Sequence, residues 1–98
     1  GDSVRMIPVS EVLLLEAADK YVIVHTASGE ALIRESLRDL LERLDQTMFQ
    51  QIHRSTIVNM AAVSEAVRDH RGKLVLQIKG LDQQPPVSRL YAHLFKAM

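Results

Sequence analysis

Cysteine and tryptophan are both absent from this chain of 98 residues. Without cysteine there is no disulfide framework and no thiolate metal site, which fits the reducing cytoplasm. No apolar run approaches the length of a membrane span, and no signal-peptide pattern stands at the start. We therefore expect a cytoplasmic chain without contact to a membrane, large enough for one domain.

The chain also lacks the sequence features of a catalytic or metal-binding site. It has no glycine-rich nucleophile turn and no glycine loop that could hold a phosphate. His25, His70 and His93 are scattered, without the short spacings of metal ligands, and we expect them at the surface. Ser55 and His53 stand two residues apart with no oxyanion device between them. We expect no enzyme activity, no metal and no cofactor.

An excess of charge of one sign is missing as well, because 12 Lys and Arg balance 12 Asp and Glu. This balance counts against a nucleic-acid binder, since DNA attracts proteins mainly through its phosphates. Residues 1–48, however, hold nine acidic and five basic side chains, whereas residues 49–98 hold three acidic and seven basic. The balances are −4 and +4, and a local field counts for more than the total. Halves of so small a chain also differ by chance.

Short strands and one helix are expected in the first half. Residues 5–9, 12–18 and 21–26 are typical of strands, with a turn at residues 10–11, and residues 27–30 form a hairpin turn into 31–34. Ser36 and Asp39 have the spacing of a helix start. Leucines then recur at the helical period and are assigned to the core: Leu37, Leu40, Leu41 and Leu44.

The second half continues with strands and ends in a helix. Strands are expected over residues 51–58, 62–68 and 73–79, with a turn at 69–72, and residues 88–98 indicate a helix with Ser88 as N-cap. The result is a mostly β domain of the α+β class, with one middle and one C-terminal helix. No helix-turn-helix is visible, so any reading of DNA would have to come from loops.

Two polar segments contain arginine beside a hydroxyl. The first is His53-Arg54-Ser55, which interrupts two apolar runs, and the second is Ser88-Arg89. Arginine can hold a guanine edge through two parallel hydrogen bonds, while a hydroxyl or imidazole can bind a phosphate. These two Ser/Arg segments therefore suggest one surface for nucleic acid.

The order and spacing of several blocks give the chain a resemblance to the LytTR domain, the DNA-binding output module of many bacterial response regulators. The match runs over nearly the whole chain. The blocks are residues 7–12 (IPVSEV), 15–22 (LEAADKYV), 35–37 (ESL), 49–59 (FQQIHRSTIVN), 79–81 (KGL) and 87–89 (VSR). No single block would suffice. The resemblance implies an elongated fold of short antiparallel strands in small sheets, whose loops enter successive major grooves.

The resemblance also implies roles for individual residues. Arg54 and Arg89 are expected to contact bases, each with a surface salt bridge as the alternative. Lys20 belongs to a third DNA-contacting loop, where it reads a base or binds a phosphate. Contacts to the DNA backbone are expected from His53, Ser55, Ser88 and Tyr21. Alternatively His53 shapes its loop, Ser88 caps a helix and Tyr21 packs at a strand start; Asn59 is assigned a structural role.

Taken with the residues, the resemblance predicts sequence-specific binding of double-stranded DNA in a bacterial transcriptional regulator. Residues 5–98 form the domain, and residues 1–4 are a linker or a remnant of cloning. The family usually carries a receiver or sensor domain upstream and binds paired repeats, so two copies on DNA are expected. The rival hypothesis is an interaction module that binds an anionic ligand or a protein partner, which zero net charge favours.

Overall fold

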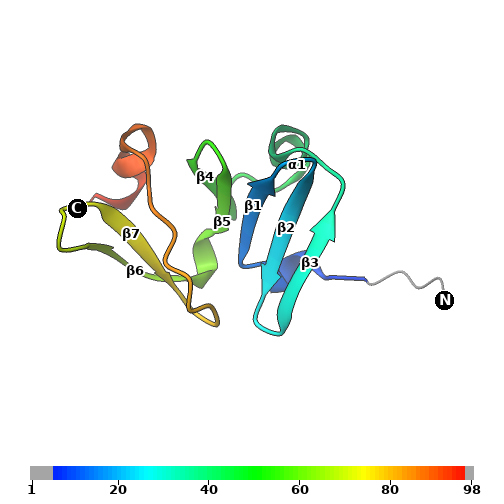
Figure 1. Ribbon diagram of the computed structural model, residues 1–98, viewed down its shortest axis with the longest axis horizontal. Coiled ribbons are helices and arrows are strands. Elements are labelled where there is room, and N and C mark those ends of the chain that lie inside the picture. Colours follow the sequence, from blue (N-terminus) through cyan, green and yellow to red (C-terminus); the bar gives the residue numbers. More distant parts are fainter. Residues whose placement is uncertain (1–5, 97–98) are drawn as a thin grey trace.

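Two antiparallel sheets lie side by side along the long axis of the molecule (Figure 1). The computed structural model describes residues 6–96, with extents of 48 × 25 × 24 Å. The expected mostly β fold with an elongated outline is confirmed. Within the described residues, no helix is long and apolar enough to cross a membrane.

The larger sheet has five strands in the order β3-β2-β1-β5-β4, and the smaller sheet pairs β6 with β7. The strands are β1 (Leu14–Ala18), β2 (Tyr21–Thr26), β3 (Gly29–Ile33), β4 (Phe49–His53), β5 (Thr56–Asn59), β6 (Val63–Arg68) and β7 (Leu74–Ile78). The helices are α1 (Leu37–Arg43) and the 3-10 turns η1 (Val9–Glu11), η2 (Met60–Ala62) and η3 (Arg89–Phe95).

The strand expected over residues 5–9 is wrong for its described part. Residues 6–8 are irregular, and η1 follows, closed by a 2.9 Å hydrogen bond from the amide of Glu11 to the carbonyl of Pro8. Proline cannot donate a ladder hydrogen bond, which explains why the chain turns here instead of joining the sheet. Arg5 and the linker expected at residues 1–4 lie outside the described residues.

The single strand expected over residues 51–58 is also wrong, because the chain folds back on itself there. β4 and β5 form an antiparallel hairpin with Arg54 and Ser55 at its tip, and a register shift between Gln51 and His53 bends β4. The polar side chains at the tip could not lie in the middle of one continuous strand, because the strand residues before and after them are buried or partly buried. The correction puts Arg54 at the end of a rigid hairpin.

The C-terminal helix begins where expected but winds as a 3-10 helix, η3, rather than as a longer helix to residue 98. The amide of Tyr91 donates to the carbonyl of Ser88 at 3.0 Å, the tighter i to i+3 bond. Ser88 occupies the N-cap position, yet its side chain makes no cap hydrogen bond. Its hydroxyl is therefore not committed to the helix. Residues 97 and 98 lie outside the described residues.

Apolar residues of the larger sheet are buried on both of its faces. Leu15 and Ile57 belong to one core, together with Leu37 of α1, while Leu14 and Val58 belong to a second core with Leu76 of the smaller sheet. Alternate residues of a strand point to opposite faces, so the neighbours Leu14 and Leu15 serve different cores. The sheet is thus held between α1 and β6–β7.

The leucine pattern of α1 is confirmed. Leu37 is buried, and Leu40, Leu41 and Leu44 are partly buried against the first core. Ser36 caps the helix as expected, since its hydroxyl accepts from the amide of Asp39 at 3.1 Å.

The structural role assigned to Asn59 is confirmed as well. Its buried amide donates to the carbonyl of Val12 at 2.9 Å, and its oxygen accepts from the amide of Ala61 at 3.0 Å.

Candidate nucleic-acid interface

The β1–β2 turn and the β4–β5 turn lie next to each other at one end of the larger sheet. β1 pairs with β5 in a register that sets Glu16 opposite Thr56, and the amide of Ala17 donates to the carbonyl of Ser55 at 2.8 Å. The strand ladder therefore brings Lys20 and Arg54 to the same edge, although they are far apart in the sequence.

Lys20 is exposed in a tight turn after Asp19, whose φ of 57° lies in the left-handed region that aspartate tolerates. Tyr21 begins β2 and is 38% exposed. The guanidinium carbon of Arg34 stands 5.7 Å from the centre of the Tyr21 ring, within range of a cation–π contact. Arg34 is thus a further cation near this turn, which the sequence motifs did not indicate.

Arg54 is exposed at the tip of the β4–β5 hairpin, and His53 and Ser55 organise that tip from within. The Nδ1 atom of His53 accepts from the amide of Ser55 at 3.2 Å and lies 2.9 Å from its hydroxyl. Because an amide can only donate, Nδ1 is the unprotonated nitrogen, and the ring proton of the neutral imidazole sits on Nε2. His53 shapes its loop and still has an N–H for another partner.

The second Ser/Arg segment is hydrogen-bonded directly to the β4–β5 hairpin. The amide of Ser88 donates to the carbonyl of Ile52 at 2.9 Å, and the amide of Val87 donates to the carbonyl of Leu74 at 2.9 Å. Val87 is buried in the second core. Arg89 therefore projects from backbone that is anchored on both β4 and β7, and it is exposed.

A basic groove of about 620 Å³ joins the two Ser/Arg segments to the β6–β7 turn. Its charged or titratable lining consists of His53, Arg68, Arg71, Lys73 and Arg89, and none of the residues 6–96 brings a carboxylate to it. The three β6–β7 cations were not among the expected site residues, although the basic excess of the second half was a signal for them. Within residues 6–96, Lys20, Arg54 and Arg89 form no salt bridge, so the surface ion pairs considered for the two arginines are not present.

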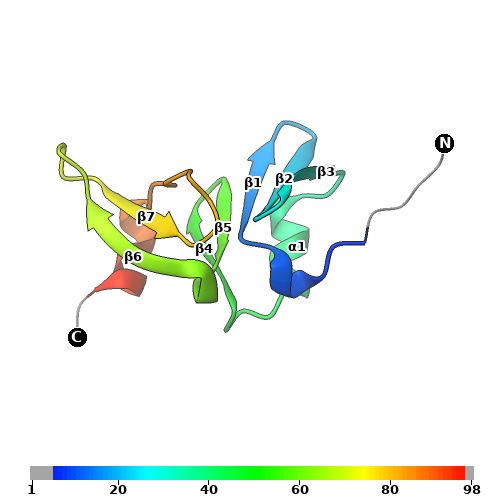
Figure 2. The ribbon, with the colours of Figure 1, turned by 90° about the horizontal axis from the view of Figure 1, so that it is seen from below.

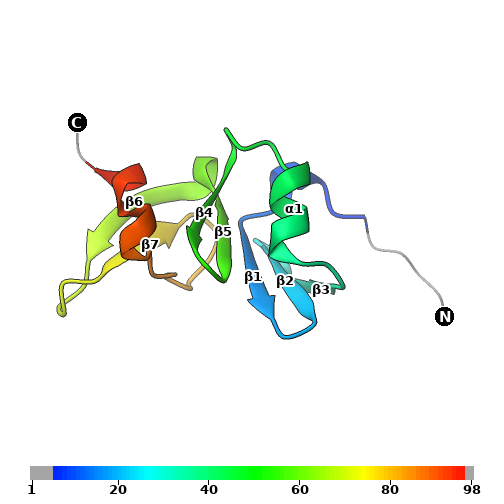
Figure 3. The same ribbon diagram turned by 90° about the horizontal axis from the view of Figure 1, so that it is seen from above.

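The β1–β2, β4–β5 and β6–β7 turns face the same long side of the molecule. Figure 2 shows them along its upper edge, and Figure 3 shows them along its lower edge, with α1 on the other side in both views. The turns that carry Lys20 and Arg54 thus lie on the same side as the β6–β7 turn, whose cations line the groove together with Arg89.

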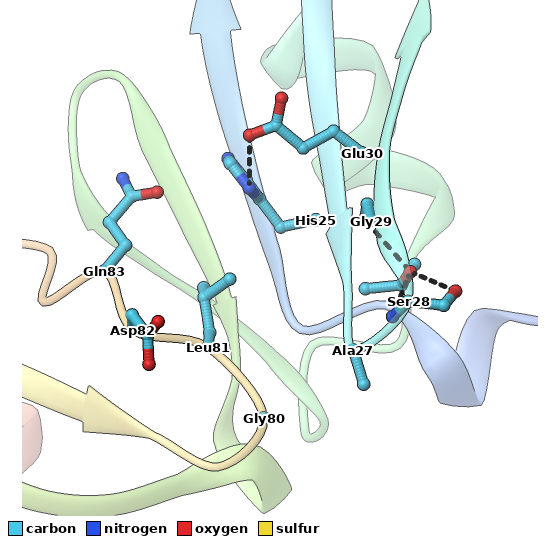
Figure 4. Close-up of a pocket in the computed structure, with 10 residues that line it drawn as sticks. His25, Ala27, Ser28, Gly29, Glu30, Gly80, Leu81, Asp82 and Gln83 are labelled. Carbon is cyan, nitrogen blue, oxygen red and sulfur yellow. Dashed lines mark hydrogen bonds and ion pairs between the residues drawn. The ribbon is translucent and has the colours of Figure 1, made fainter.

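An acidic pocket of about 480 Å³ lies at the opposite ends of β2 and β7. It is lined by the β2–β3 turn and the loop after β7 (Figure 4), and its charged residues are Glu30 and Asp82. His25, which also lines it, is only 3% exposed, so the expected surface position of His25 is wrong. His70 and His93 are exposed as expected.

The buried ring of His25 has carboxylate partners on the two adjacent strands. Its Nε2 lies 2.8 Å from Glu16 of β1 and its Nδ1 lies 3.4 Å from Glu30 of β3, the residue opposite it in register. Gln83 donates to the other oxygen of Glu16 at 3.2 Å. Despite this cluster, no group of three or more His, Asp or Glu within residues 6–96 could hold a metal ion.

Comparison with known proteins gives a consistent result. The family model of the LytTr DNA-binding domain matches residues 2–98. An uncharacterized response regulatory protein of Vibrio cholerae is 42% identical over 98% of this chain and 38% of its own length. The CO-responsive transcriptional regulator RcoM of Rhodospirillum rubrum is 33% identical over 91% of this chain and 38% of its own length. This chain thus spans less than half of these relatives.

A solved structure has the same fold. The LytTr DNA-binding domain of a methyl-accepting/DNA response regulator from Bacillus cereus superposes with a TM-score of 0.79 and 30% identity, covering 90% of this chain and 80% of that one. The positive alginate biosynthesis regulatory protein of Pseudomonas aeruginosa is a further relative, 34% identical over 81% of this chain and 32% of its own length.

Proposed function

Because the chain belongs to the LytTr DNA-binding domain family, we propose that it binds double-stranded DNA in a sequence-specific manner as the output domain of a bacterial transcriptional regulator. The observation that carries the proposal is the set of exposed cations in turns along one side, together with a basic groove to which none of the described residues contributes a carboxylate. Such a surface complements the regular negative charge of a duplex.

Arg54 and Arg89 are the proposed base readers. Both are exposed, neither is held by a carboxylate within residues 6–96, and both project from anchored backbone. An arginine held in this way can present its planar guanidinium to the O6 and N7 atoms of guanine in the major groove. Lys20 is the contact of the third loop, and we assign it to a phosphate because an ammonium group binds as a point charge.

Contacts to the DNA backbone are proposed for His53, Ser55, Ser88 and Tyr21. The Nε2–H of His53 and the uncapped hydroxyl of Ser88 are donors next to the base readers. Ser55 shares the hairpin tip with Arg54, and Tyr21 begins the strand after Lys20. Bonds of this kind fix the register of a protein on the duplex without reading its sequence.

The dimensions of the molecule support contact with more than one groove. Its long axis measures 48 Å, whereas one turn of B-DNA measures about 34 Å. The β6–β7, β4–β5 and β1–β2 turns follow one another along this axis in Figure 2, and we propose that loops on this side enter successive major grooves. Loops take the place of a recognition helix, and the chemistry is recognition rather than catalysis.

The rest of the regulator is proposed from the relatives. They include a response regulatory protein and transcriptional regulators, and this chain spans 38% of the first of them. We therefore propose that residues 5–98 form the DNA-binding domain of a longer cytoplasmic protein, with a receiver or sensor domain upstream, in a two-component system. Two copies would occupy paired repeats in a promoter.

Fluorescence anisotropy with promoter fragments from the chain's own operon tests the function. An unrelated duplex of the same length is the control, and both are titrated at one stated salt concentration. Tighter binding to a promoter fragment supports the proposal. Equal affinity for both duplexes, or no binding, contradicts sequence-specific recognition and favours an interaction module for another anionic ligand or a protein.

A further inference from the structure

The β6–β7 turn carries cations that the three expected DNA-contacting loops do not account for. Arg68 ends β6, and Arg71 and Lys73 follow in the turn, all three exposed and all lining the basic groove. Ser88 and Arg89 of the second Ser/Arg segment line the same groove. The turn also faces the same long side as the β1–β2 and β4–β5 turns (Figures 2 and 3).

Hydrogen bonds within the turn hold these cations in place. The carboxylate of Asp69 accepts from the amides of Arg71 and Lys73, both at 2.9 Å, and the amide of Asp69 donates to the carbonyl of Lys73 at 2.8 Å. The guanidinium of Arg68 donates to the carbonyl of Gly72 at 2.8 Å. Gly72 has a φ of 80°, which a residue with a side chain rarely adopts.

The one acidic residue of the turn is therefore occupied by backbone amides. The hydrogen bond from the amide of Lys73, and then that from Arg71, lower the pKa of the Asp69 carboxyl. The Asp69 carboxylate is ionised, but it contacts backbone amides of the turn and does not line the groove. Arg71 and Lys73 are free of salt bridges within residues 6–96 and extend from a fixed backbone.

We propose that the β6–β7 turn is a fourth DNA-contacting loop, whose Arg71 and Lys73 bind the phosphodiester backbone of the duplex that Arg54 and Arg89 read. The inference rests on the proposed function and extends its footprint. A groove lined by cations and Ser88, to which the described part of the chain contributes no carboxylate, fits a chain of phosphates rather than base edges. In Figure 2 the β4–β5 turn, which carries Arg54, lies between the β6–β7 turn and the β1–β2 turn, so phosphate contacts flank Arg54 on both sides.

The test compares two double variants that remove the same charge. Arg71→Ala/Lys73→Ala removes two cations of the β6–β7 turn, and Arg38→Ala/Lys79→Ala removes two exposed cations from α1 and from the far end of β7. Binding is measured over a range of salt concentrations, with a duplex that the wild-type chain enriches from a random library and with a shuffled duplex. Circular dichroism melts of both variants check the fold.

We expect the turn variant to make the plot of log affinity against log salt shallower by about two units, because each neutralised phosphate contributes about 0.9. Both duplexes should lose affinity alike, and the preference for the enriched duplex should remain. The control variant should keep the wild-type slope.

Three results overturn the inference while leaving the proposed function standing: an unchanged slope in the turn variant, an equal loss in the control variant, or a loss confined to the enriched duplex. A wild-type chain that binds neither duplex instead contradicts the proposed function itself.

Discussion

The basic groove and the acidic pocket lie at opposite ends of β7 and differ in both charge and construction. β7 leads from Lys73 at the groove to Gly80 at the pocket. The chain has no net charge, yet the cations that line the groove are separated from Glu30 and Asp82 at the pocket. Zero total charge therefore does not exclude a basic surface that attracts a duplex, because the local field counts for more than the total.

The two histidines that line these cavities show the difference in construction. His53 stands at the groove, with Nδ1 occupied by Ser55 and with Nε2 able to donate. His25 is buried at the pocket between Glu16 and Glu30. The groove rests on an apolar core through backbone hydrogen bonds, whereas the pocket is lined by a buried histidine that is paired with two carboxylates. We infer that one cavity serves recognition and the other serves the packing of the two sheets.

The largest effect is expected from the apolar support of the groove. Ile52 is fully buried, and its carbonyl anchors Ser88, so Ile52→Ala should destabilise the fold by roughly 2–5 kcal/mol. Leu90→Ala is the matched control, because Leu90 is 73% exposed and should cost less than about 0.5 kcal/mol. Urea unfolding measures both. Equal stabilities would show that the groove does not depend on this core.

The next largest effect is expected from the two arginines that are proposed to contact bases. Arg54→Ala and Arg89→Ala should each lower affinity for the preferred duplex about tenfold or more, since a lost bidentate contact costs roughly 1–3 kcal/mol. Melting temperatures should stay unchanged because both side chains are exposed. Arg38→Ala on α1 is the control and should bind like the wild type. Wild-type binding by either of these two arginine variants, or early melting, would remove that arginine from the list of base readers.

A substitution at the acidic pocket should lower the stability of the fold and leave the DNA affinity of the folded protein unaltered. His25→Ala removes the partner of two carboxylates and should destabilise the fold by roughly 1–3 kcal/mol. The DNA affinity of the folded fraction should not change, as anisotropy at low temperature can measure. His93→Ala, at an exposed position, serves as the control. If His25→Ala altered the preference between duplexes at full folding, the division between the two cavities would be wrong.

The smallest effect is expected at Lys20. As a phosphate contact, it should contribute about one unit to the slope of log affinity against log salt, so Lys20→Ala should weaken preferred and random duplexes alike. Arg54→Ala should mainly weaken the preferred duplex. A salt titration of both variants on both duplexes separates the two behaviours. Loss of preferred affinity alone at an unaltered slope would make Lys20 a base reader.

Much of the fold could be predicted from the sequence, because several patterns are local. The spacing of leucines after Ser36 correctly predicted α1, and the alternation around Leu76 correctly predicted β7. The strand expected across Arg54 failed because composition does not show where a hairpin reverses. The surface position expected for His25 was wrong, because the burial of its ring depends on Glu16 and Glu30 from neighbouring strands. Residues that are distant in sequence decide its burial.

The candidate site, like the fold, could be predicted from the sequence only in part. The sequence by itself determined the family, the two Ser/Arg segments and the basic excess of the second half, because motif, residue type and charge are properties of the chain. Only the tertiary structure decided that Lys20 and Arg54 share one edge of the larger sheet, that Arg71 and Lys73 line the same groove as Arg89, and that the acidic pocket lies at the other end of β7. Strand register and the backbone bonds of Ser88 create these neighbours, and pairing between distant segments forms only when the chain folds.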